Sequence, residues 1–259
     1  MTLSPAALAL ALASKAPFFS RRHRPSRKDR SMLRLYGFSA SNYYNIVKLA
    51  LLEKGLAFDE VLTYTGADEH HQPEYLEKSP LGKVPCLETD EGFISESRCI
   101  IAYLEHAYPE RPLFPASAFA RAKLLELTQI IDLYLELAAR RLLPNLFART
   151  EPPASVANDV RQTVAKGTRG LSRLARFDGY LVGDRFTAAD ISAAVHLPAV
   201  RRILRTVLNE DPLAEVPGLA EYMARMEARA MVQKIRADRA ANYPEFIAHI
   251  QARYARPAP

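Results

Sequence analysis

The stretch GKVPCL, residues 82–87, decides how the first half of the chain folds. Val84, Cys86 and Leu87 are typical of a buried strand, but Pro85 lies among them. Proline has no N–H to donate to a neighbouring strand, so it is rare in the middle of a sheet. The stretch therefore predicts either an edge strand or a strand whose backbone pairs with another molecule.

The segments around this stretch predict the order β-α-β-(α)-β-β-α. Alternating apolar residues, helical spacing and turn residues mark the individual segments. In chain order these are a strand at 33–36, a helix from about residue 46 that ends at Lys54 and Gly55, a strand at 58–63, a short helix beginning at Pro73, strands at 82–87 and 93–94, and a helix from Ser97 to about Tyr108. The first strand, helix and strand imply a parallel pair with a right-handed crossover, and the turn at 89–92 implies an antiparallel hairpin.

The second half of the chain is expected to be helical. Prolines at 109, 112 and 115 interrupt both helix and sheet, so this part is interpreted as a linker. Amphipathic stripes and a capping box predict the helices that follow. The stripes cover 124–138, which ends near Pro144, and 156–174; the capping box is Thr187–Asp190, and a further helix is expected from Pro217 to Ala230.

Positive charge is concentrated in the first 31 residues. The chain has 259 residues and a formal net charge of +6, and residues 1–31 hold seven Lys or Arg against one acidic residue. The remaining residues carry equal numbers of acidic and basic side chains, 28 of each, so no nucleic-acid partner is expected. We expect residues 1–31 to be a disordered extension, with an organellar targeting segment as the alternative.

The two cysteines and the apolar segments indicate the compartment. Cys86 and Cys99 have neither metal-binding nor redox spacing, and both are expected to be small buried apolar residues. A disulfide framework is therefore not expected, and a reducing compartment is. The apolar part of the extension, residues 3–13, is too short to cross a bilayer. The expectation is a cytoplasmic protein without a membrane partner.

A small mixed sheet followed by helices, together with three local motifs, resembles the cytosolic glutathione transferases over about residues 32–240. The motifs are SPLGKVP at 79–85, Glu96-Ser97, and SASNYY at 39–44. The resemblance implies a thioredoxin-like α/β domain with a mixed four-stranded sheet, followed by an all-α helical domain. The expected boundaries are an extension at 1–31, the thioredoxin-like domain at 32–110, a linker at 111–118, the helical domain at 119–250 and a tail at 251–259.

The first motif resembles the family segment that leads to a cis-proline. The resemblance implies a cis bond between Val84 and Pro85, with the N–H and C=O of Val84 offered to glutathione as an added strand. The missing partner of the opening stretch would then be the cysteinyl residue of glutathione. The alternative is a trans proline on an edge strand.

The second motif lies at the expected start of a helix. A helix N-terminus can hold a carboxylate, and by resemblance Ser97 binds the γ-glutamyl carboxylate while Glu96 binds the adjacent ammonium. The alternative for Ser97 is a simple N-cap. By resemblance, His70 and Lys83 match positions that often contact the glycyl carboxylate in serine-type members, although His71 competes with His70 for this match. A loop histidine and a solvated surface lysine are the commoner roles of these residues when each is taken alone.

The third motif would carry the chemistry. Ser41 falls at the position of the catalytic serine in the theta, zeta and phi classes, where the hydroxyl donates a hydrogen bond to the glutathione sulfur and stabilises the thiolate. Ser39 and Tyr36 are the alternatives for this donor, and helix capping is the structural role open to Ser41. No cysteine occurs at 39–44, which argues against disulfide-exchange chemistry.

The resemblance implies a homodimeric enzyme in which the glutathione thiolate attacks a small electrophile. It implies no metal or organic cofactor, with glutathione as co-substrate. A glutathione-dependent isomerase, dehalogenase or peroxidase would use the same first site, and a non-catalytic binding or regulatory protein could share the fold. The presence of Ser41, Val84-Pro85 and Glu96-Ser97 together favours an enzyme. Tyr134 is expected in the wall of the second-substrate pocket.

Overall fold

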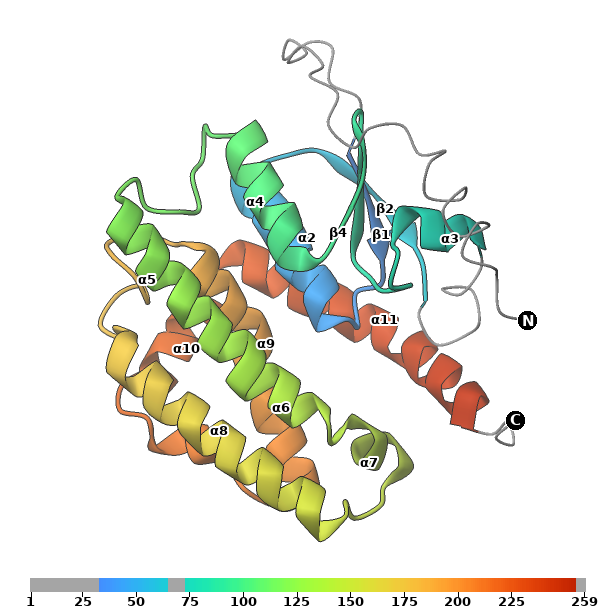
Figure 1. Cartoon of the computed structure of the whole chain (residues 1–259), viewed down its shortest axis with the longest axis vertical. Coiled ribbons are helices and arrows are strands. Elements are labelled where there is room, and N and C mark those ends of the chain that lie inside the picture. The colour runs from blue at the N-terminus through green and yellow to red at the C-terminus, as the bar shows by residue number, and fades with distance from the viewer. Residues whose placement is uncertain (1–32, 65–72, 255–259) are drawn as a thin grey trace, which may run out of the picture. The chain divides into compact units, whose positions relative to one another are not determined.

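The computed structural model describes residues 33–64 and 73–254. The chain divides into two units, Met1–Ser31 and Met32–Pro259, and all described elements belong to the second. In this unit a small sheet comes first and a set of helices follows (Figure 1). This confirms the expected α/β thioredoxin-like part followed by an all-helical part.

The sheet has four strands in the order β2-β1-β3-β4. The strands are β1 (Leu33–Gly37), β2 (Phe58–Leu62), β3 (Cys86–Thr89) and β4 (Gly92–Ser95). β1 pairs with β2 in parallel, while β1 with β3 and β3 with β4 are antiparallel, so the sheet is mixed as predicted. The predicted strand at 82–87 was wrong in its start: residues 82–85 form a loop, and pairing begins only at Cys86.

The helix α2 (Asn42–Lys54) connects the parallel strands and is held by a cap at each end. The Ser41 hydroxyl accepts the N–H of Tyr44, and Gly55 adopts the left-handed conformation that its N–H needs to reach the last carbonyls. Glycine is required at position 37, the last residue of β1, because a Cβ there would lie 2.4 Å from the Tyr44 ring. These local signals explain why the predicted end of this helix is confirmed.

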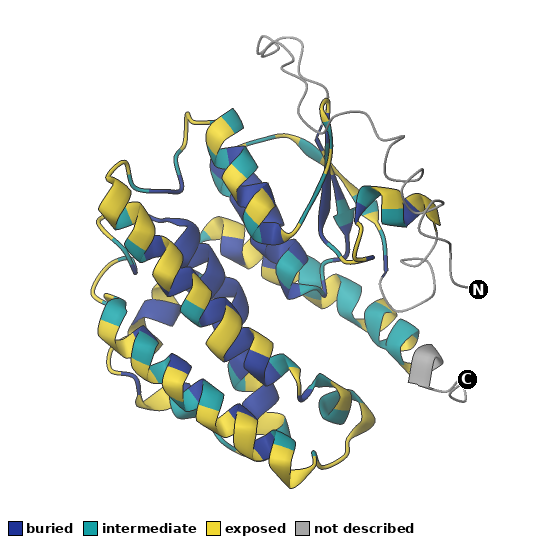
Figure 2. Ribbon diagram, viewed as in Figure 1, coloured by how far each residue is buried: buried dark blue, intermediate teal, exposed yellow. Residues whose placement is uncertain are grey.

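The remaining helices of this part cover the sheet. α4 (Ser97–Ala107) lies beside α2 and packs on β3 and β4, and α3 (Pro73–Lys78) packs against β4. Figure 1 shows α3 on the other side of the strands from α2 and α4. The side of α2 that faces the molecule is almost completely buried (Figure 2).

Helices form the rest of the chain. They are α5 (Ala118–Gln129), a π-helical segment η2 (Ile130–Glu136), α6 (Leu137–Arg140), α7 (Leu143–Ala148), α8 (Ala154–Leu174), α9 (Ala188–Leu208), a short 3-10 helix η3 (Pro212–Glu215), α10 (Leu219–Glu227) and α11 (Ala230–Tyr254). The first predicted stripe is one nearly continuous helix from α5 to α6 with a π segment inside it. Pro144 does not close this helix but lies in the first turn of α7, where its missing N–H has no cost.

The central helix α9 starts at the predicted capping box. The Thr187 side chain accepts the N–H of Ala189 at 3.3 Å, and Asp190 accepts the N–H of Thr187 at 2.8 Å. Asp190 also accepts the hydroxyl of Tyr222 on α10. The first half of α9 is buried, and the helix packs against α2 as well as against the other helices.

The last helix, α11, returns to the sheet part and packs against α2. The buried ammonium of Lys48 lies 2.6 Å from Glu60 on β2 and 2.8 Å from Asp238 on α11. Since α11 runs on to Tyr254 past Pro244, its second half reaches the loop that follows β1. The C-terminal helix thus completes the surroundings of that loop.

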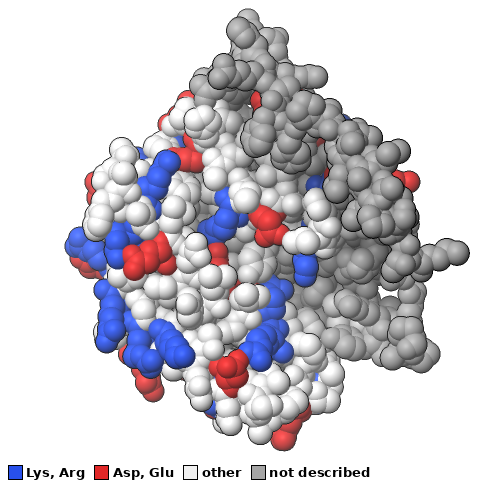
Figure 3. Space-filling model, viewed as in Figure 1, with Lys and Arg blue, Asp and Glu red and all other residues white. Residues whose placement is uncertain are grey.

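None of the helices within the described ranges is long and apolar enough to cross a bilayer. On the face drawn in Figure 3, acidic and basic side chains lie close together in several places. Ion pairs between exposed side chains occur in the described part of the chain, such as Arg161 with Glu210 at 2.7 Å.

Candidate active site

A cavity of about 850 Å³ opens between the sheet part and the helical part. Its sheet-side wall consists of the loop after β1, residues 81–85 and the start of α4. Its helical wall is formed by side chains from η2, α6, α7, α9 and α11. The volume lies in the upper part of the range of small-molecule sites.

The bond between Val84 and Pro85 is cis, which confirms the expectation drawn from the first motif. The loop before it is held by Ser79, whose buried hydroxyl donates to the carbonyl of Lys83 at 2.8 Å and accepts the Lys83 N–H at 3.2 Å. The Tyr75 hydroxyl donates to the same carbonyl. Among the described residues no hydrogen bond uses the N–H or C=O of Val84, which lines the cavity. This backbone is therefore available to an extended ligand.

Glu96 and Ser97 line the same cavity. Ser97 is buried as the first residue of α4. Glu96 precedes it with a backbone φ of 67°, which residues other than glycine rarely adopt. The interpretation of Ser97 as an N-cap was wrong, because Glu96 is at that position and its side chain makes no capping bond. The first N–H groups of α4 thus remain free to hold an anion.

Ser41 also lines the cavity, at the N-terminus of α2. Its oxygen accepts the N–H of Tyr44 at 3.4 Å, and this capping bond leaves the hydroxyl proton free to donate elsewhere. The capping role and a role toward a ligand therefore coexist in one side chain. A hydroxyl donor at a helix N-terminus favours an anion nearby.

The two alternatives to Ser41 lie elsewhere. Of the described residues, neither Ser39 nor Tyr36 lines the cavity. The Tyr36 hydroxyl donates to Glu88 at 2.6 Å, and burial together with this carboxylate raises the pKa of Tyr36 to about 12. The Ser39 carbonyl accepts the side chain of Asn45, which fixes the loop backbone.

The residues expected at the glycyl carboxylate are only partly described. Lys83 is exposed and lines the cavity. His70 and His71 lie outside the described residues.

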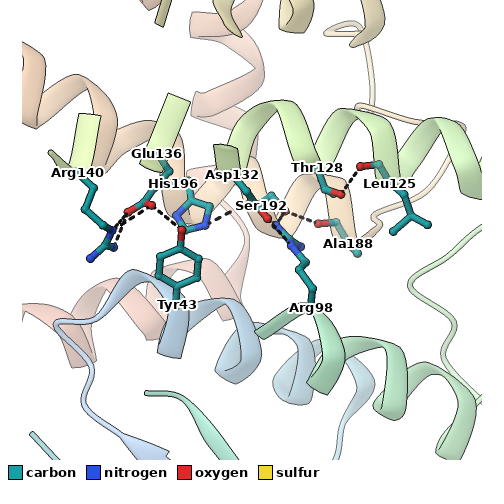
Figure 4. A network of polar contacts seen from close by, with 10 residues as sticks. All are labelled: Tyr43, Arg98, Leu125, Thr128, Asp132, Glu136, Arg140, Ala188, Ser192 and His196. Carbon is teal, nitrogen blue, oxygen red and sulfur yellow. Dashed lines mark hydrogen bonds and ion pairs between the residues drawn. The ribbon is translucent and has the colours of Figure 1, made fainter. Parts of the chain in front are cut away.

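The far wall of the cavity contains a polar cluster that joins α2 to the helices (Figure 4). The Tyr43 hydroxyl donates to Glu136 at 2.7 Å, and Arg140 donates to the same carboxylate at 2.5 Å while lying over the Tyr43 ring. Burial, followed by the charge of Glu136, raises the pKa of Tyr43. Burial alone would raise the pKa of Glu136, but the hydrogen bonds and charge of Arg140 outweigh it, so the net shift is downward.

The cluster continues from Arg98 to a buried histidine. Arg98 binds Asp132 through two nitrogens, at 2.6 and 2.5 Å, and donates to Ser192. His196 is fully buried, its Nε2 lies 3.6 Å from Asp132, and neither ring nitrogen has a hydrogen-bond partner among the described residues. Burial lowers the pKa of His196 to about 4, although Asp132 and Glu136 oppose the shift. The π-helical turn of η2 presents Asp132 and Glu136 on one side, next to this ring.

Several cavity residues had no place in the sequence interpretation. The expected Tyr134 is 45% exposed and is not among the lining residues, whereas its neighbours Leu133 and Leu137 line the cavity. The residues that were missed on the later helices are Arg140, Arg202, Arg239, Tyr243, Phe246 and Ile250. One signal could have found the last three residues, since Tyr243, Phe246 and Ile250 recur at helical spacing on both sides of Pro244.

The two cysteines lie outside this cavity. Cys86 is buried, as expected, and burial raises the pKa of its thiol to about 12. Cys99 is exposed, so the expectation that both are buried was wrong. On α4 it follows Ser97 by two residues and therefore points to the opposite side of the helix from that buried residue.

Comparison with known proteins gives consistent matches over both parts of the chain. Residues 35–112 match the family model of the glutathione S-transferase N-terminal domain, and residues 134–225 match that of the C-terminal domain. A glutathione S-transferase of Pseudomonas putida is 39% identical over 221 residues, which are 85% of this chain and 99% of that protein. A maleylacetoacetate isomerase of Pseudomonas aeruginosa is 29% identical over 174 residues, 66% of this chain and 82% of that protein.

The solved structures give the same result. The glutathione S-transferase of Methylobacterium radiotolerans, in complex with glutathione sulfonate, superimposes with a TM-score of 0.66 at 27% identity, over 79% of this chain and 94% of that one. The matches thus cover both parts of this chain and nearly the full length of the Pseudomonas putida relative. The chain belongs to the glutathione S-transferase family.

Proposed function

We propose that the chain is a glutathione transferase that binds glutathione against the sheet-side wall of the cavity and transfers it to a small electrophile. The observation that carries the proposal is that Ser41, Val84 and Ser97, from three separate segments, line one cavity. The named transferase from Pseudomonas putida supports it, since it matches 85% of this chain. So does the neighbour solved with glutathione sulfonate.

Each part of the tripeptide has a chemically matched group. The free backbone of Val84 pairs with the cysteinyl residue as an added strand. Ser97 and the N-terminus of α4 hold the γ-glutamyl carboxylate, and Glu96 holds the neighbouring ammonium. Lys83 lies where it can bind the glycyl carboxylate, with His70 as a further candidate outside the described residues.

The chemistry consists of stabilising a thiolate and presenting it to carbon. The Ser41 hydroxyl donates a hydrogen bond to the sulfur and keeps its proton, and the N-terminus of α2 adds a partial positive charge. The thiolate electron pair forms the new carbon–sulfur bond, the leaving group departs with its bonding electrons, and the thiol proton is released to solvent. Every step is supplied by side chains and backbone, so the proposal includes no metal or organic cofactor.

We infer that the enzyme is a homodimer. Large apolar side chains remain exposed on both parts, for example Leu62 at 58% and Phe119 at 77%. A dimer interface that covers these side chains would remove their apolar surface from water. Light scattering coupled to gel filtration tests this inference, and a mass near 29 kDa would contradict it.

A glutathione-dependent isomerase is the second candidate, favoured by the match to the maleylacetoacetate isomerase of Pseudomonas aeruginosa. Such an enzyme would use the same thiolate, which adds to a double bond and leaves again after rotation. The two candidates differ in their product, because an isomerase returns free glutathione and a transferase consumes it.

Retention on immobilised glutathione, followed by a conjugation assay with an aryl halide, tests the proposal. We expect retention and turnover by the natural chain, and retention with at least tenfold lower turnover by Ser41→Ala. Absence of retention would contradict the binding site. Glutathione that is required but not consumed would transfer the conclusion to the isomerase.

A further inference from the structure

We propose that the second substrate is an aromatic electrophile bearing a carboxylate, and that Arg202 and Arg239 bind this carboxylate. The inference rests on the proposed glutathione transfer and names the class of its electrophile. It is carried by two guanidinium groups that line the cavity without a carboxylate partner among the described residues.

The charges that line the cavity are unequal in number. Five lining residues are basic, namely Lys83, Arg98, Arg140, Arg202 and Arg239, and two are acidic, namely Glu96 and Asp132. Arg98 is compensated by Asp132, and Arg140 is compensated by Glu136. The uncompensated positive charge on the helical side therefore belongs to Arg202 on α9 and Arg239 on α11.

Arg239 is held in place by a neutral group. Its Nη1 donates to the side-chain oxygen of Asn42 at 2.7 Å, and Asn42 directly follows Ser41. The neighbouring carboxylate of Asp238 is bound to Lys48 at 2.8 Å and to Lys234 at 2.9 Å. Burial lowers the pKa of Arg239, and the charge of Arg202 lowers it further. A guanidinium nevertheless stays charged in proteins. A bound anion would therefore offset the cost of partly burying the Arg239 charge without a carboxylate partner.

Arg202 is held by an aromatic side chain. Its Nη2 donates to the Tyr243 hydroxyl at 2.6 Å, and its guanidinium carbon lies 5.1 Å from the centre of the same ring. The remaining N–H groups of Arg202 and Arg239 have no bond to an acidic side chain in the described part of the chain. Guanidinium groups bind carboxylates through two parallel hydrogen bonds, which makes such a pair selective for that anion.

Aromatic rings lie next to this charge. Phe38 and Phe246 are stacked with centroids 5.3 Å apart, and Tyr243 and Phe147 lie 6.1 and 5.9 Å from Phe246. All four line the cavity. A flat apolar ring packs well against such a wall, while its carboxylate reaches the arginines. The anchoring of Arg239 at Asn42 places this subsite next to Ser41, where the sulfur would lie.

Two glutathione conjugates that differ in one group provide the test. S-(p-carboxybenzyl)glutathione and S-(p-nitrobenzyl)glutathione have similar shape, but only the first carries a charge on the aryl ring. Their dissociation constants are measured by calorimetry on the full chain, Arg202→Gln, Arg239→Gln, Arg239→Lys and the control Arg236→Gln. Arg236 lies on the same helix but pairs with Glu227 and is not among the residues that line the cavity.

We expect the natural chain to bind the carboxybenzyl conjugate at least tenfold more tightly than the nitrobenzyl one. Each glutamine variant should weaken carboxybenzyl binding about tenfold to hundredfold, the loss of a charged hydrogen bond, and change nitrobenzyl binding less than twofold. Arg239→Lys should retain part of the preference, and Arg236→Gln all of it. The unchanged nitrobenzyl affinity shows at the same time that the variants are folded.

Equal affinity of the natural chain for the two conjugates would overturn the inference. So would equal losses for both conjugates in the glutamine variants. If Arg239 instead stabilised the thiolate, its variant would leave both conjugates unaffected, because their sulfur is alkylated, and would raise the pKa of bound glutathione. Glutathione itself is titrated in parallel: if it binds and the preference is absent, only this inference fails, whereas no glutathione binding removes the proposed function as well.

Discussion

The side chain of Asn242 on α11 accepts the backbone N–H of Ala40 at 2.9 Å, across 202 positions of the sequence. Its amide nitrogen donates to the Tyr64 hydroxyl at 2.6 Å. Ala40 lies between Ser39 and Ser41, in the loop that carries the candidate catalytic serine. One side chain of the C-terminal helix therefore holds the backbone of that loop.

Asn242→Ala should lower kcat/KM for an aryl halide about tenfold. The substitution removes the acceptor of the Ala40 N–H and one donor to the Tyr64 hydroxyl, so the loop loses the contact that fixes Ser41. Asn242→Asp should lose less, because a carboxylate still accepts the Ala40 N–H. Gln233→Ala on an exposed part of α11 is the control. Unchanged kinetics in Asn242→Ala would show that the loop needs no support from α11.

Ser41→Ala should raise the pKa of bound glutathione, because the thiolate loses its hydrogen-bond donor. The measurement is the pH dependence of kcat/KM, and about tenfold to hundredfold lower turnover is expected at neutral pH. Ser117→Ala is the matched control: Ser117 caps α5 through a bond of the same 3.4 Å length but does not line the cavity. A shifted profile in Ser39→Ala, with Ser41→Ala unchanged, would reassign the donor to Ser39.

His196 should make the protein less stable as the pH falls below about 6.5. Its pKa is lowered to about 4 by burial, so the unfolded chain takes up a proton in this range before the folded chain does. The stabilisation is complete above the unfolded pKa and is lost as the pH falls toward the folded one. From pH 6.5 to about pH 5 the loss amounts to about 2 kcal/mol.

Urea unfolding of the natural chain and of His196→Leu at both pH values measures this contribution. The variant removes the titrating group, so its free energy of unfolding should decrease about 2 kcal/mol less than that of the natural chain. The comparison is made within each protein, which cancels any difference in packing. Parallel pH dependence of the two proteins would mean that folding leaves the pKa of His196 unchanged.

Asp190→Ala should destabilise the fold by about 3 kcal/mol. Its buried carboxylate accepts the N–H of Leu181, the N–H of Thr187 and the hydroxyl of Tyr222, and all three would lose their partner. The expected fall in Tm is about 6–12 °C. Asp159→Ala is the control, since Asp159 forms an exposed ion pair with Arg141 and should change Tm little. A similar Tm for both variants would contradict the importance of the capping box.

The sequence by itself determined those features whose physical cause lies within a few residues. The cap at Gly55, the capping box of Thr187 and Asp190 and the interruption of a strand at Pro85 each depend on groups that are adjacent in the chain. Such signals are strong enough to place the mixed sheet and the start of α9. They also led to the segments that hold Ser41 and Ser97.

Only the tertiary structure decided what surrounds these segments. In the tertiary structure Ser41 lines the cavity and Ser39 does not. His196 is buried, and its ring nitrogens have no hydrogen-bond partner in the described part of the chain. Arg202 and Arg239 come together on one wall of the cavity. The reason is that each of these outcomes depends on how α9 and α11 pack against α2, and packing between distant helices leaves no local pattern in the sequence.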